Sequence, residues 1–138
     1  MMDAFITVRG VQVVDGDESV TELNTEGSFG IKNGHPVICY DDSESFGEGT
    51  QTKISVMNGS VVLSRSGGAD MRMIIEKGHR HSCSYKTLQG ELLLDFLGEE
   101  VSSNLNEQGG SLRLAYEIYA GAGKLSDNKL EITVRSRD

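Results

Sequence analysis

Proline, tryptophan and cysteine are scarce in this sequence, whose 138 residues include one proline, no tryptophan and two cysteines. Two cysteines are too few for the disulfide framework of a small secreted domain, so we expect Cys39 and Cys83 to be free thiols. No run approaches the roughly 20 apolar residues of a membrane-spanning helix. Because no basic and apolar leader precedes the first β-prone segment, we expect a cytoplasmic protein.

Basic residues are outnumbered by acidic ones. The chain has 13 Lys and Arg residues against 21 Asp and Glu residues, which gives a formal net charge of -8 at pH 7. This excess opposes attachment to phosphate backbones and to anionic lipids. We therefore expect neither nucleic acid nor a membrane as a partner. A small molecule and a second copy of the chain remain as candidate partners.

Glycine is the abundant residue, with 17 copies, and two of them belong to Asn-Gly pairs. Asn33-Gly34 and Asn58-Gly59 each lie between short runs rich in β-branched residues. An Asn-Gly turn takes positive φ at both central residues, and its twist matches that of two antiparallel strands. Both pairs therefore predict β-hairpins.

Apolar residues alternate with polar ones along most of the chain, which is typical of half-buried strands. We expect a bulge at Gly10, where the apolar phase changes, and a third hairpin over residues 71–87. Little helix is expected. The prediction is a single domain, 1–138, with an all-β fold: an antiparallel meander barrel of about eight to ten strands. The expected strands include residues 4–14, 36–40, 53–57, 60–65, 80–87, 112–118 and 130–134.

Signatures of catalysis are missing. No serine has glycines two residues to either side, as a nucleophile elbow requires. His79 or His81 could serve as the base of a hydrolase or isomerase, but no partner nucleophile or orienting carboxylate is identifiable. We therefore predict a protein that is not an enzyme and has no catalytic residue and no cofactor.

Two groups of candidate metal ligands are also rejected. His79, His81 and Cys83 share one expected strand face, but alternate side chains stand about 7 Å apart and do not converge on one ion. The acidic stretch 41–49 lacks the ligand order of a calcium-binding hand, so we expect an exposed, solvated loop. No metal site is predicted.

Arg65 is the most informative single residue, because its alternation with Val61 and Leu63 directs the guanidinium toward the expected core. A buried arginine requires acceptors. It is either a polar anchor inside a ligand cavity or a structural plug, and for Arg65 itself we favour the plug, because polar networks often specify a fold without binding a ligand. The candidate partners are Tyr40, Asp42, Tyr85 and Tyr116.

A series of short motifs resembles those of the YwiB-like bacterial family, a domain of unknown function. The resemblance extends from Phe5 to Val134 and implies a compact β-barrel of the calycin type, the group that includes lipocalins, but no reaction. Its most specific motifs are Arg-x-Gly and Tyr-x-Thr-x-x-Gly. The matching residues are Tyr40 with the acidic residues after it, Thr52-Lys53-Ile54, Arg65-Ser66-Gly67, Met73, Tyr85-Lys86-Thr87 with Gly90, Tyr116 and the strand Leu130–Val134.

Two hypotheses about function follow. In the first, the barrel binds a small anionic or amphipathic molecule in its lumen without catalysis. In the second, side chains such as Leu63, Phe96 and Leu114 fill the barrel, which is then a structural or protein-interaction module. An open lumen of about 300 Å³ or more would favour the first hypothesis. Its predicted ligand-binding residues are Arg65, Tyr40, Tyr85, Thr87 and Tyr116.

Overall fold

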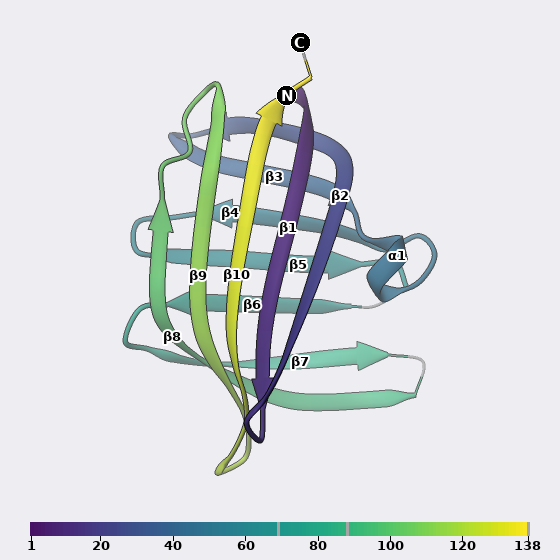
Figure 1. Ribbon diagram of the computed structural model, residues 1–138, viewed down its shortest axis with the longest axis vertical. Coiled ribbons are helices and arrows are strands. Elements are labelled where there is room, and N and C mark those ends of the chain that lie inside the picture. The colour runs from purple at the N-terminus through teal and green to yellow at the C-terminus, as the bar shows by residue number, and fades with distance from the viewer. Residues whose placement is uncertain (69, 88, 138) are drawn as a thin grey trace.

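The computed structural model describes residues 1–68, 70–87 and 89–137, and these ranges contain ten strands and one short helix. In Figure 1, β1, β2, β9 and β10 run along the long axis of the molecule, and β3 to β7 run across it. The helix is α1 (Ser43–Phe46). The strands are β1 (Met2–Val14), β2 (Asp17–Lys32), β3 (His35–Asp41), β4 (Gln51–Val56), β5 (Ser60–Ser66), β6 (Met71–Glu76), β7 (Arg80–Thr87), β8 (Gly90–Ser103), β9 (Gly109–Ala120) and β10 (Gly123–Ser136).

All ten strands form one antiparallel sheet in the order β6-β5-β4-β3-β2-β1-β10-β9-β8-β7. Each strand pairs with its neighbour in sequence, except that β6 and β7 stand at the two ends of the sheet. The ladder between β1 and β10 joins the two ends of the chain, with Ile6 opposite Val134. The predicted all-β meander barrel is therefore confirmed, and the structure is a nearly closed barrel.

The barrel closes only in part between β6 and β7. Asp70 and Lys86 exchange two backbone hydrogen bonds at one end of this seam, and His79 donates to the Glu76 carbonyl at the other. Between these points the described residues form no ladder. The two bridges differ in register by one residue, so a single regular ladder cannot satisfy both. The predicted third hairpin is thus wrong as a continuous ladder, although its turn and both strands exist.

Two local predictions are also corrected. The β1 register runs through Gly10 without interruption on both sides, so the strand has no bulge there, and Val11 and Val13 are half-buried on the opposite face from Val8. Asn33 and Gly34 both take positive φ, 53° and 80°, as predicted. In the second Asn-Gly turn only Gly59 does, at 78°.

The core lies at the end of the barrel where β1, β2 and β10 present their apolar faces to β3, β4 and β5. Phe29, Ile38 and Ile54 are fully buried there. Two register shifts bend the longer strands, one between Gly98 and Glu100 in β8 and one between Lys124 and Ser126 in β10. In Figure 1, β8 starts beside β7 and then curves to run beside β9.

Gly98 holds the bend of β8 against the β6–β7 turn. Its carbonyl accepts a hydrogen bond from Gly78, and its N–H donates to His79. A Cβ at this position would lie 2.3 Å from the Glu76 carbonyl oxygen, so we expect Gly98→Ala to destabilise the protein by about 1–3 kcal/mol in urea unfolding. Gly123→Ala is the control, because its nearest atom would be 3.7 Å away. Equal midpoints for the two variants would show that the seam does not depend on this contact.

Candidate functional site

A cavity of about 530 Å³ lies inside the barrel and is bordered by buried core residues such as Leu63, Met73 and Phe96. Residues of α1 and of every strand except β4 line it, and they include both members of an ion pair, Asp42 and Arg65. Of the predicted ligand-binding residues, Tyr40, Arg65, Tyr85 and Tyr116 line it. Thr87 ends β7, and its side chain lies outside the part of the chain that the structure describes.

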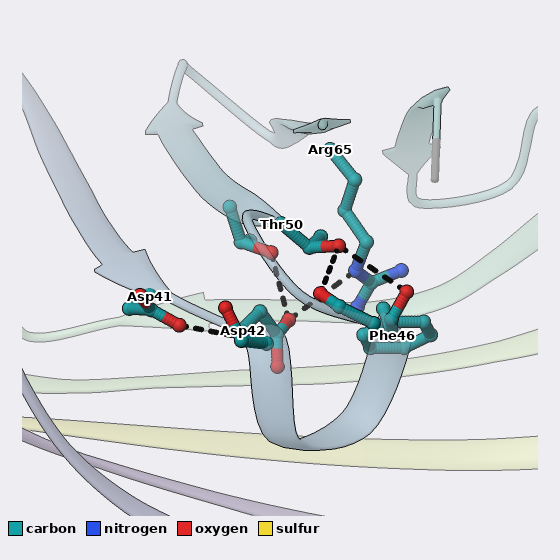
Figure 2. Close-up of polar contacts among 8 residues, drawn as sticks. Asp41, Asp42, Phe46, Thr50 and Arg65 are labelled. Atoms are coloured by element: carbon teal, nitrogen blue, oxygen red, sulfur yellow. Dashed lines mark hydrogen bonds and ion pairs between the residues drawn. The ribbon is translucent and has the colours of Figure 1, made fainter. Parts of the chain in front are cut away.

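The ion pair is part of a small polar network (Figure 2). Arg65 Nε donates to Asp42 Oδ2 at 3.4 Å, and Thr52 Oγ1 donates to the same oxygen at 2.7 Å. The Arg65 and Asp42 side chains are 13% and 3% exposed. On its other side the guanidinium stacks on the Phe46 ring, with 3.8 Å from Cζ to the ring centroid. These contacts fix the position of the charged group at the cavity wall.

Asp42 overturns part of the prediction of a solvated acidic loop. Asp41 and Glu48 are exposed as expected, but Asp42 is buried. The reason is that the segment after β3 folds back as α1 and is held in place by Thr50. The Thr50 backbone carbonyl accepts a hydrogen bond from the Asp42 N–H, and the Thr50 hydroxyl donates one to the Gly47 carbonyl at 2.7 Å. The signal was present in the sequence, because Ile38, Tyr40 and Asp42 alternate onto one face.

Two tyrosines surround the ion pair. Tyr40 is 3% exposed and lines the cavity beside Asp42 and Arg65. Burial, and secondarily the Asp42 carboxylate, raise the pKa of Tyr40 well above its ordinary value. Burial of the hydroxyl also raises the pKa of Tyr116, while the nearby charge of Arg65 acts in the opposite direction. Both phenols are therefore neutral hydrogen-bonding groups at physiological pH.

The guanidinium retains unused donors. In the described ranges only Nε of Arg65 donates a hydrogen bond, and neither terminal nitrogen has a protein acceptor. A guanidinium offers five N–H donors in a planar fork, and a carboxylate or similar anion accepts two of them in parallel. The geometry therefore suits the recognition of an anionic group that enters from the cavity.

The histidines lie away from this network. His81 Nε2 is 2.9 Å from Glu76 Oε1, a contact that lowers the pKa of the Glu76 carboxyl. Cys83 lies in the seam between β6 and β7, where burial raises its thiol pKa and a hydrogen bond from the Arg72 backbone lowers it to a smaller extent. No cluster of three metal-ligating side chains occurs within residues 1–68, 70–87 and 89–137. The helix that these ranges contain is too short to cross a membrane.

The comparisons with known proteins agree with this architecture. The model of the family described as "Domain of unknown function (DUF1934)" matches residues 6–132. The chain belongs to this family. The uncharacterized β-barrel protein YwiB of Bacillus subtilis (strain 168) is 29% identical over 114 residues, which are 83% of this chain and 80% of YwiB. The predicted resemblance to the YwiB-like family is thereby confirmed.

A crystal structure of YwiB from Bacillus subtilis confirms the fold independently. It superposes with a TM-score of 0.90 and 26% sequence identity, over 99% of this chain and 93% of the other. The family is uncharacterised, so the comparisons supply an architecture and no activity.

Proposed function

We propose that this protein is a cytoplasmic, non-enzymatic binder of a small anionic or amphipathic molecule, held in the barrel lumen by Arg65. One observation carries the proposal. The guanidinium stands at the wall of a cavity of about 530 Å³ with its two terminal nitrogens unpaired among the described residues. This volume lies within the range of about 300–1,000 Å³ that small-molecule sites usually have.

Preorganisation supports an anion at this position. Phe46 and Asp42 already hold the guanidinium in one orientation, so little side-chain freedom would be lost on binding. Charge-assisted hydrogen bonds are about twice as strong as neutral ones. Because Asp42 balances the charge of Arg65, the site favours a singly charged anion over a doubly charged one.

The rest of the lining supports an amphipathic ligand. Tyr85 and Tyr116 add phenol groups to the lining, and apolar side chains form most of the remaining wall. The polar remainder of the lining is Gln12, Ser19, Thr21, Glu22, Ser45, Asn128 and Lys129. Burial of apolar ligand surface against such a wall contributes roughly 25 cal/mol per Å² before the costs of association. The apolar lining residues include Leu63, Met73, Leu94, Phe96, Ile118 and Leu130.

A protein-interaction module is the second candidate, and one observation favours it. Leu93 is 73% exposed on the outer face of β8, whereas Leu92, 58% exposed, alternates onto the other face. A large apolar side chain exposed on the outer face is compatible with a contact site between proteins. In this candidate function the network of Arg65 and Asp42 only ties α1 to the barrel.

Filling the lumen separates the two candidates. We expect the amphipathic anion 1-anilinonaphthalene-8-sulfonate to bind wild-type protein at one saturable site, measured by fluorescence titration. Leu130→Trp places an indole in the cavity and is expected to weaken binding at least tenfold. Leu93→Trp introduces the same side chain on the outer face and should bind as wild type does. Equal affinity in Leu130→Trp, or no saturable binding to wild type, would reject the lumen as the site.

A further inference from the structure

A second polar group, formed by the side chains of Gln12, Asn128 and Ser126, borders the same cavity through its first two members. Gln12 Nε2 donates to Asn128 Oδ1 at 3.1 Å, and Asn128 Nδ2 donates to Ser126 Oγ at 2.8 Å. Asn128 is 8% exposed and Ser126 4%. Gln12 and Asn128 line the cavity together with Arg65.

This amide group interrupts two apolar strand faces. The inward face of β1 carries Ile6 and Val8 before Gln12. On the antiparallel β10, Leu130 and Ile132 follow Asn128 on the same face. An amide taken out of water costs free energy unless its hydrogen bonds are made. Apolar residues would have continued the core, so the change to amides at the cavity suggests a polar partner there.

The hydrogen bonds within the group leave some capacity unused. An Asn side chain has two N–H donors and an oxygen with two lone pairs. Within the described ranges the Asn128 oxygen accepts one hydrogen bond, from Gln12, and its nitrogen donates one, to Ser126. The Ser126 hydroxyl accepts a hydrogen bond and donates none in the same ranges. Asn128 lines the cavity, so a hydroxyl or amide of a ligand could engage its unused donor or acceptor there.

Tyr116 relates the two polar groups in space. Its backbone lies opposite Asn128 in the ladder between β9 and β10. Its hydroxyl end is close enough to Arg65 for that charge to affect its pKa. Tyr116, Asn128 and Arg65 all line the same cavity. The neighbouring Phe96 ring, with its centroid 6.0 Å from that of Tyr116 and its plane tilted by 58°, adds a second aromatic surface to the wall.

We propose that the ligand is a short molecule with two polar ends: a singly charged anion that binds Arg65 and a neutral hydroxyl or amide that binds Asn128. A flat or apolar body joins them alongside Tyr116. This inference rests on the proposed function, because it assigns the second contact of the same lumen site. The simpler account is that Gln12 and Asn128, which are direct cross-strand partners, only stabilise the ladder.

Matched pairs of probes test the second contact. Calorimetric titration would compare benzoate, phenylacetate and 3-phenylpropanoate with their 4-hydroxy derivatives, because each pair differs by one hydroxyl and the series varies the distance between the ends. We expect the hydroxyl to strengthen binding about fivefold to tenfold for at least one length, as one buried hydrogen bond would do. Asn128→Leu should remove this gain, so that each 4-hydroxy acid binds no more tightly than its unsubstituted partner.

Two controls separate the outcomes. Asn24→Leu makes the same change on the exposed outer face of β2 and should preserve the gain. If Asn128→Leu does not fold, Gln12→Leu at the more exposed member of the group repeats the test. Equal binding within every pair in wild type, or a gain that survives both variants, overturns the two-ended ligand and leaves the lumen binder standing. Failure of all six acids to bind wild type overturns the two-ended ligand alone if 1-anilinonaphthalene-8-sulfonate still binds at one saturable site, and overturns both proposals if that probe also fails.

Discussion

Arg65→Met is expected to lower the free energy of unfolding by about 3–5 kcal/mol, because it leaves the Asp42 carboxylate buried without its counter-charge. Asp42 is 3% exposed and keeps one hydrogen bond, from Thr52. The substitution also removes the stacking of the guanidinium on Phe46. Urea unfolding monitored by circular dichroism measures the loss.

A double variant separates the ion pair from simple packing. Asp42→Asn combined with Arg65→Met removes both charges, and we expect it to recover most of the stability that Arg65→Met loses, since replacing a buried pair as a unit is often nearly neutral. If Arg65→Met alone unfolds at the wild-type urea midpoint, the carboxylate is hydrated and the network in Figure 2 does not hold the charge as described.

Phe29→Ala is expected to cost about 3–5 kcal/mol, the usual range for a large aromatic side chain removed from a well-packed core. Phe29 is 0% exposed, lies opposite Ile38 in the ladder between β2 and β3, and belongs to the largest fully buried side chains. Thermal and urea unfolding should both report the loss, with the slope against urea unchanged.

Phe5→Ala is the matched control for that variant. Phe5 lies on the outer face of β1, is 39% exposed, and contacts Arg135 and Arg137 through its ring. Exposed cation–π contacts contribute about 0.5–1 kcal/mol each, so the control should lose far less than Phe29→Ala. Comparable losses would mean that the two faces of β1 and β2 are assigned the wrong way round.

The hairpins could be predicted from the sequence because turn chemistry is local. Asn33-Gly34 takes the expected conformation, and Val56 pairs with Val61 across the second Asn-Gly turn. The alternation that placed Arg65 among core residues also needed only its own strand. Its partner Asp42 could be named as a candidate for the same reason, since it continues the inward face of Tyr40.

What could not be predicted depends on contacts distant in sequence. The β6–β7 seam follows from Gly98, which lies 20 residues or so beyond the turn that it holds. The burial of Asp42 depends on Thr50 folding the acidic segment back over the barrel mouth. The bulge predicted at Gly10 failed for a local reason. The apolar residues change face after Gly10 because Val11 and Val13 lie half-buried on the outer face of a regular strand, and the register continues without interruption.

Native mass spectrometry tests the ligand-binding account most directly. Wild-type protein and Leu130→Trp would be purified in parallel under gentle conditions and sprayed from the same volatile buffer. The account predicts an adduct of one defined mass on the wild-type chain that is missing from Leu130→Trp. A bare wild-type chain, together with no shift in melting temperature across a panel of small organic anions, would contradict it.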